Sequence, residues 1–194
     1  MLRFLVLSLT LSYTLAVSDT FKWKDCTTAA NRALAVSNIK VSPLPLTVPG
    51  PLTLSFDASL SKPLNNVNLI LEVEKNLGFF GYVKVPCLNE IGSCTYDGCE
   101  KATELGNYLK VTDNSIFKQI YTMLKNNHIN LFGCPVPSPQ TGSVKAFNYT
   151  IPNPGKQFDW LVNGDYHIIA RIQDKVSKVD YACLDLNIGV MRKA

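Results

Sequence analysis

The sequence predicts an all-β protein in which antiparallel strands form a sandwich or cup, with one helix inserted between them. Apolar and polar residues alternate along several segments, and this period of two is typical of strands with one buried face. Turn-forming runs such as Pro49-Gly50-Pro51 and Asn65-Asn66 separate the segments. Regular short strands divided by turns are typical of antiparallel sandwiches.

The first residues predict a secretory signal over 1–18. Arg3 supplies a positive charge, 4–17 is an apolar run interrupted by Ser and Thr, and Ala16-Val17-Ser18 has the small-x-small pattern of a cleavage site. The run is shorter and more interrupted than the ~20 apolar residues that a membrane span needs, and a retained anchor is the alternative. We expect 19–194 to form one secreted, soluble domain.

Alternation predicts strands near both ends of this domain. The clearest case is 52–60, where five apolar residues beginning with Leu52 alternate with Thr53, Ser55, Asp57 and Ser59. The predicted strands cover 34–41, 52–60, 67–73, 79–85, 144–151, 166–172 and 184–190.

Helical spacing replaces alternation between the two groups of strands. Asp113 is a plausible N-cap, and Ile116, Ile120, Met123 and Leu124 follow on one face. The sequence predicts an amphipathic helix over 114–126.

The distribution of charged residues argues against a nucleic-acid partner. The chain has 19 basic and 15 acidic residues and a formal net charge of +4. The basic residues are scattered, which is unlike a nucleic-acid-binding surface, although a positive excess favours anionic membrane surfaces weakly. We expect no nucleic-acid partner.

All six cysteines follow the signal, and an even number in a secreted chain indicates three disulfides. Fifteen pairings are possible from the count alone. A zinc site is the alternative, but there is no C-x-x-C pair, and only His128 and His167 offer nitrogen ligands.

Motifs for catalysis are lacking. The sequence contains no G-x-S-x-G, phosphate loop or dinucleotide fingerprint. His167 lies in an alternating segment, where a structural position is the simpler interpretation. We therefore expect neither an enzyme nor a bound cofactor or metal.

Five motifs together resemble the ML (MD-2-related lipid-recognition) family, and they occur in that family's order. They are Phe21-Lys22-Trp23-Lys24-Asp25-Cys26, Val48-Pro49-Gly50, the two-cysteine loop at 85–96, Cys134-Pro135, and the segment 160–166. The resemblance implies three bridges: Cys26 with Cys183, Cys87 with Cys94, and Cys99 with Cys134.

The resemblance also implies that the sandwich is open. A closed sandwich fills its interior with side chains and binds nothing, whereas the ML fold, an immunoglobulin-like sandwich, parts its two sheets around an apolar lipid cavity. The residues expected to line this cup are apolar members of the alternating segments: Leu54, Phe56, Leu69, Leu71, Phe80, Tyr82, Ile168, Leu184 and Leu186.

A membrane-contact loop is expected at the mouth of the cup. Its predicted apolar residues are Phe158, Trp160, Leu161 and Val162, and the alternative is that Trp160 packs in the core. Asn148-Tyr149-Thr150 fits the N-x-T acceptor pattern, so Asn148 is a candidate glycosylation site unless strand pairing protects it.

The function expected from the resemblance is extraction and transfer of a lipid, either a glycosphingolipid or a phospholipid, from a membrane surface. In the family's best-known role a glycosphingolipid is presented to a lysosomal hexosaminidase, which implies a secreted or lysosomal location. The alternative is an extracellular signalling or defence factor that carries a lipid or binds a receptor and serves no hydrolase.

Overall fold

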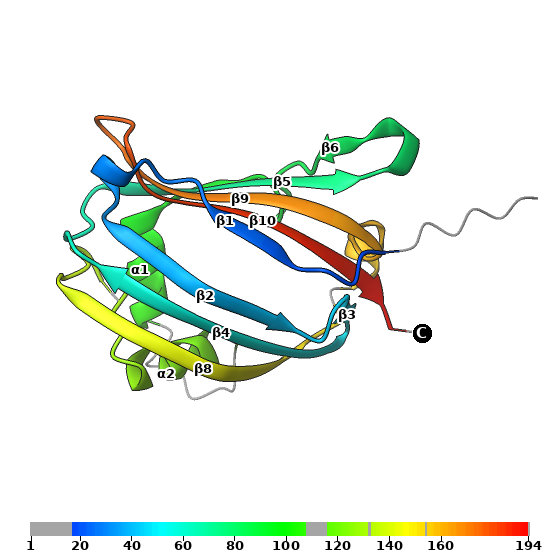
Figure 1. Ribbon diagram of the computed structural model, residues 1–194, viewed down its shortest axis with the longest axis horizontal. Coiled ribbons are helices and arrows are strands. Elements are labelled where there is room, and N and C mark those ends of the chain that lie inside the picture. Colours follow the sequence, from blue (N-terminus) through cyan, green and yellow to red (C-terminus); the bar gives the residue numbers. More distant parts are fainter. Residues whose placement is uncertain (1–16, 108–115, 132, 154, 194) are drawn as a thin grey trace, which may run out of the picture.

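Two β-sheets face each other in the computed structural model, which describes residues 17–107, 116–131, 133–153 and 155–193 (Figure 1). The larger sheet has the order β1-β10-β9-β5-β6, with β3 added beside β10 and β7 beside β5, and the smaller sheet has the order β2-β4-β8. Among the described strands only β3 and β10 pair in parallel. The predicted all-β, antiparallel sandwich is confirmed.

The strands extend most of the predicted segments by a few residues. They are β1 (Lys22–Asp25), β2 (Leu34–Ser42), β3 (Leu46–Val48), β4 (Gly50–Leu60), β5 (Val67–Asn76), β6 (Tyr82–Lys84), β7 (Thr95–Asp97), β8 (Gln140–Ile151), β9 (Gly164–Asp174) and β10 (Asp180–Arg192).

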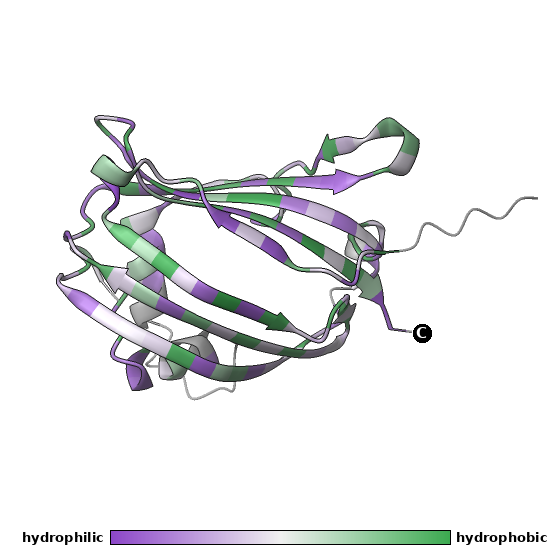
Figure 2. Cartoon of the chain, in the orientation of Figure 1, coloured by the Kyte–Doolittle hydropathy of each residue, from purple (hydrophilic) through white to green (hydrophobic). Residues whose placement is uncertain are grey.

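Cross-strand registry explains how the alternation builds an apolar inner face. In the larger sheet Leu71 pairs with Ala170, which pairs with Leu184. In the smaller sheet Leu54 pairs with Phe147. Because side chains alternate between the faces of a strand, apolar and polar stripes succeed one another along both sheets (Figure 2).

The region predicted as a strand over 79–85 begins with a turn, and only Tyr82–Lys84 form a strand. Gly78 and Gly81 have φ values of 63° and 70°, in the left-handed region that glycine tolerates. They enclose the short 3-10 helix η2 (Gly78–Phe80), and β6 begins only at Tyr82. The prediction was wrong at Phe79 and Phe80 because the two glycines reverse the chain there.

Helices occupy the segment between the two groups of strands. The helix α2 (Ile116–Asn126) agrees with the predicted helix, whose first residues and Asp113 lie outside the described residues. The helix α1 (Gly98–Asn107) was not predicted, although Asp97 caps it by accepting hydrogen bonds from the backbone N–H groups of Cys99 and Glu100. None of the helices in the described part of the chain is long and apolar enough to span a bilayer.

In the described part of the chain, two clusters of buried apolar residues make up much of the core. One joins Leu60 and Leu64 to Val67, at the start of β5, and includes Ala33 and Val136. The other consists of Leu124, Ile129 and Val144 beside α2. Both lie away from the Asn76 end of β5, where the buried apolar residues Val162 and Tyr166 belong to neither cluster.

The structure contains the three disulfides that the resemblance implied. They join Cys26 to Cys183, Cys87 to Cys94, and Cys99 to Cys134. All six sulfur atoms are therefore committed to bridges, which leaves no cysteine thiolate for the alternative zinc site.

Candidate lipid-binding site

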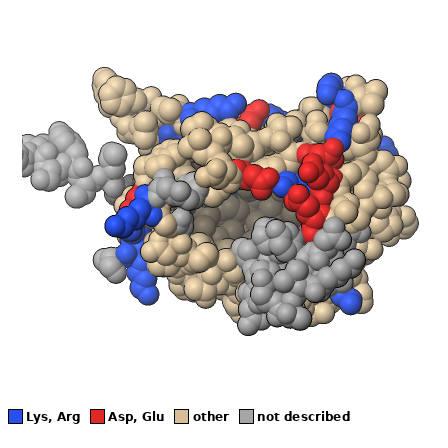
Figure 3. Space-filling view, turned by 180° about the vertical axis from the view of Figure 1, so that it is seen from behind, with Lys and Arg blue, Asp and Glu red and all other residues tan. Residues whose placement is uncertain are grey.

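The two sheets do not close on each other along their whole length. Leu71, Ile168 and Leu184 of the larger sheet and Leu54 of the smaller sheet remain only partly buried, although they lie on apolar stripes. Figure 3 shows the molecule hollowed on the side hidden in Figure 1, between the surfaces formed by the two sheets. Partly exposed apolar side chains thus lie on the facing strands, and the molecule is hollowed between the two sheets.

Seven of the nine residues predicted to line the cup lie in the facing strands. Five belong to β5, β9 and β10 of the larger sheet and two to β4 of the smaller sheet, and each is partly buried. They are Leu69, Leu71, Ile168, Leu184, Leu186, Leu54 and Phe56.

The other two predicted lining residues lie elsewhere. Phe80 is 78% exposed and Tyr82 is 48% exposed. Tyr82 lies edge-on to His167, whose imidazole contacts polar residues of neighbouring strands. The prediction was wrong for this pair, because the turn at Gly78 and Gly81 carries Phe80 out of the sandwich and Tyr82 of β6 faces His167 on the outer side of the larger sheet.

An aromatic hairpin instead projects from the larger sheet, and we call residues 77–83 the aromatic finger (Figure 1). Phe79 is fully exposed and contacts Phe80 edge-on, with ring centroids 5.7 Å apart. Leu77 is also exposed. The sequence signal for this finger was the pair of phenylalanines enclosed by Gly78 and Gly81, which indicates a turn that presents apolar side chains.

The predicted membrane-contact loop is partly exposed. It forms the 3-10 helix η4 (Lys156–Leu161), in which Trp160 is 45% exposed and Leu161 is partly buried. Val162 is only 7% exposed, so it belongs to the packed interior and not to a contact surface. The side chain of Phe158 lies outside the described residues.

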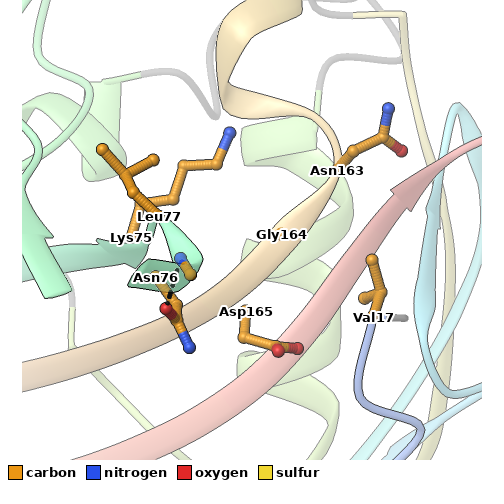
Figure 4. Close-up of a pocket in the computed structure, with 8 residues that line it drawn as sticks. Val17, Lys75, Asn76, Leu77, Asn163, Gly164 and Asp165 are labelled. Carbon is orange, nitrogen blue, oxygen red and sulfur yellow. Dashed lines mark hydrogen bonds between the residues drawn. The ribbon is translucent and has the colours of Figure 1, made fainter. Parts of the chain in front are cut away.

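A mixed polar and apolar pocket lies between the base of the aromatic finger and the start of β9. Its volume is about 370 Å³, and Figure 4 shows its lining residues Val17, Lys75, Asn76, Leu77, Asn163, Gly164 and Asp165. The Lys75 ammonium donates a hydrogen bond to the Trp160 carbonyl and lies 6.0 Å from the centre of the Tyr166 ring. Burial lowers the pKa of Lys75. Polar groups able to contact a lipid headgroup therefore lie beside the finger.

Two residues at the end of the expected signal segment lie at this pocket. The Ser18 backbone N–H donates to an Asp165 carboxylate oxygen at 2.8 Å. Val17 lines the pocket beside it. Residues 1–16 lie outside the described residues.

The outer face of the larger sheet carries a ladder of charged groups. His167 Nδ1 lies 3.1 Å from Glu74 Oε2, and its Nε2 lies 3.0 Å from Asp185 Oδ1. Lys24 extends the ladder at 3.1 Å from Asp185. The hydrogen bond to Glu74, aided by that to Asp185, raises the pKa of His167 against the effect of burial. His167 thus links neighbouring strands through these contacts, which is a structural role.

The glycosylation candidate lies on the surface of β8. Asn148 is exposed, and its side-chain oxygen accepts a hydrogen bond of 2.7 Å from the Thr53 hydroxyl on the neighbouring strand β4. An enzyme would therefore have to displace this bond to modify the amide. No group of three or more His, Cys, Asp or Glu side chains within the described ranges is arranged to hold a metal ion.

Comparison with known proteins places these features in a family. The ML domain model matches residues 20–190. The chain is 28% identical to the ganglioside GM2 activator of Mus musculus over 153 residues, which are 76% of this chain and 71% of that protein. It is 36% identical to the ganglioside GM2 activator of Macaca fascicularis over 81 residues, 40% of each chain. Since the family match covers nearly the whole chain, the protein belongs to the ML domain family.

Proposed function

We propose that this member of the ML domain family is a non-enzymatic protein that binds a lipid between its two sheets and transfers it between membranes. Two observations carry the proposal. Apolar side chains on the inner face of the larger sheet, among them Leu71, Ile168 and Leu184, remain partly exposed, and the molecule is hollowed between the surfaces of the two sheets (Figure 3). An acyl chain would cover this surface.

Transfer energetics explain why such a protein is useful. At ~0.8 kcal/mol per methylene, moving an acyl chain of ~16 carbons into water costs on the order of 13 kcal/mol. Spontaneous exit from a bilayer is therefore very slow. A cup that replaces bilayer contacts with protein contacts lowers this barrier.

The contact with the bilayer is assigned to one end of the molecule. The aromatic finger lies at the end where η4 and the C-terminus lie (Figure 1). Phe79, Phe80 and Trp160 expose aromatic surface there. Arg192 and Lys193 are exposed, and basic side chains gather at this end of the molecule (Figure 3). Aromatic insertion combined with positive charge favours an anionic lipid surface.

The bound lipid, the partner enzyme and the location are proposed from the similarity to the matched proteins. Because two matched proteins are ganglioside GM2 activators, we assign to the cup a glycosphingolipid or phospholipid whose headgroup rests near Lys75 and Asn76. The lipid is presented to a lysosomal hexosaminidase, and the protein acts in the lysosomal lumen or after secretion, with its signal segment removed and a glycan on Asn148.

A blocked cup tests the proposal. Leu184→Trp places a large side chain on the inner face, whereas Ile169→Trp places the same side chain on the outer face, since Ile169 pairs with Glu72 and Asp185 in the polar row. We expect Leu184→Trp to reduce extraction of a fluorescent phospholipid from vesicles by about tenfold or more and Ile169→Trp to leave it unchanged. Equal extraction by both folded variants would contradict binding between the sheets.

A further inference from the structure

A smaller cavity lies beneath α1, at the end of the sandwich away from the aromatic finger. Its volume is about 170 Å³. Leu69 and Ile172 of the larger sheet form one wall, and Ala102 of α1 and Leu131 form another. The described residues around it are apolar, glycine or disulfide-bonded cysteine, with the exception of Lys101. The cavity therefore suits a hydrocarbon group.

Lys101 contributes hydrocarbon and not charge to this cavity. Its ammonium is paired with Glu90 at 2.7 Å and with Glu104 at 2.9 Å. It also lies 5.8 Å from the centre of the Tyr96 ring. Long basic side chains commonly bury their methylenes while the charged end reaches polar partners, and Lys101 covers the cavity in this way.

The cavity continues the inner face of the cup. Leu69 and Leu71 are two residues apart on β5, and Ile172 and Ala170 are two residues apart on β9, so each pair shares a face. Val67, the next residue on this face of β5, also lines the cavity and is buried. The cavity is thus the inner end of the apolar space between the sheets.

The position of α1 is fixed against the larger sheet. A Cβ atom on Gly98 would lie only 2.8 Å from Val67 Cγ2 and 2.9 Å from the Val67 carbonyl oxygen. The Cys99–Cys134 bridge anchors the same turn. Because α1 cannot move away easily, the side chain at position 102 decides how far the cavity extends toward the helix, and alanine leaves it at nearly its greatest extent.

We propose that this cavity receives the methyl end of an acyl chain and that Ala102 sets the longest chain that fits. An apolar cavity of ~150 Å³ stays dry and binds a benzene-sized ligand, so a cavity of about 170 Å³ accommodates the end of a hydrocarbon chain. This inference rests on the proposed function and adds chain-length selection to it.

The test compares chain lengths in a variant with a smaller cavity. Ala102→Leu fills the space, and Thr103→Leu, at an exposed position of the same helix, is the matched control. The probes are diacyl phosphatidylglycerols with chains from about 12 to about 20 carbons, and each excluded methylene is expected to weaken binding about fourfold. We expect Ala102→Leu to weaken binding of the longest probe by about tenfold and to leave the shortest unchanged.

A second variant changes the cavity in the opposite direction. Leu69→Ala enlarges it from the larger sheet, and we expect the preferred chain length to increase, which tests the inference even if Ala102→Leu fails to fold. Equal effects at every chain length, or no effect from either folded variant, would overturn the inference. Absence of binding of every probe by the unaltered protein would instead overturn the proposed function.

Discussion

His167 forms ion pairs that link strands of the larger sheet, so the stability of this sheet depends on the protonation of His167. It joins Glu74 of β5 to Asp185 of β10, and Lys24 of β1 pairs with Asp185. Burial alone would raise the pKa of Asp185, but its hydrogen bonds with Lys24 and His167 lower it. The pKa of His167 is raised above its usual value of 6.5. Each shift favours the charged form in the folded protein.

These shifts predict how stability depends on pH. Because the folded pKa of His167 is raised, its contribution is complete below about pH 6.5 and is lost as the pH rises through the folded value. The contribution of Asp185 is present above its ordinary pKa of 3.8 and is lost as the pH falls through the lowered value.

The measurement is a series of thermal melts of the protein and of His167→Gln. We expect the melting temperature of the unaltered protein to exceed that of the variant by the largest margin between about pH 4 and pH 6.5, and the margin to shrink toward pH 8.5. A margin that stays constant across this range would show that protonation of His167 does not stabilise the sheet.

Some of the residues expected to line the cup or contact a membrane could be placed correctly from the sequence, and others could not. Leu71 and Leu184 could be placed on an inner face because alternation fixes the face of each residue in a long strand. Phe80 could not, since alternation fails where Gly78 and Gly81 reverse the chain. Val162 could not be separated from Trp160, because their burial depends on how η4 packs and not on their own hydropathy.

At the scale of elements, the aromatic finger can be altered without affecting the packed core, so its contribution to membrane binding can be measured apart from stability. Phe79→Ser with Phe80→Ser removes two exposed rings, each worth about 1.5–3 kcal/mol when fully buried in a membrane. We expect vesicle binding and lipid transfer to fall by about tenfold or more while the melting temperature is unchanged, because neither ring packs in the core.

Val176→Ser is the matched control for the finger. Val176 is 80% exposed on the hairpin between β9 and β10, at the end opposite the finger (Figure 1). Its loss should leave both transfer and stability unaltered. A finger variant that transfers lipid at the normal rate would contradict membrane contact through this hairpin.

Elements with repeated patterns could be predicted, and short ones could not. The strands β4, β5, β9 and β10 were evident because each presents several alternating pairs. The strands β3 and β7 have three residues each, too few for periodicity to show. The helix α1 was missed although Asp97 and Glu100 have the spacing of a capping box, because it begins at Gly98, which disfavours a helix, and contains few apolar residues.

At the scale of the whole molecule, the bridge between Cys26 and Cys183 closes nearly the entire chain. Its sequence separation is 157 residues, against 7 for Cys87–Cys94. The loop-entropy model assigns roughly 5 kcal/mol to the first bridge and about 2.5 kcal/mol to the second. Replacing both cysteines of a bridge with serine should therefore lower the free energy of unfolding more for the first pair.

Urea denaturation of the two double-serine variants measures this difference. Because β1 still pairs with β10 through four residues, we expect the protein without Cys26 and Cys183 to fold, with a lower midpoint than the protein without Cys87 and Cys94. The reverse order would indicate that local strain or residual structure in the unfolded chain outweighs loop closure.

The position of the two buried clusters has a consequence for the stability of the protein when no lipid is bound. Both buried clusters lie away from the aromatic finger, around residues such as Leu60, Leu64 and Val144. For the function proposed above, we expect the packing in these clusters to be the same with and without a bound lipid. We therefore expect the lipid-free protein to stay folded, so that one molecule can carry many lipids in successive rounds of the proposed transfer.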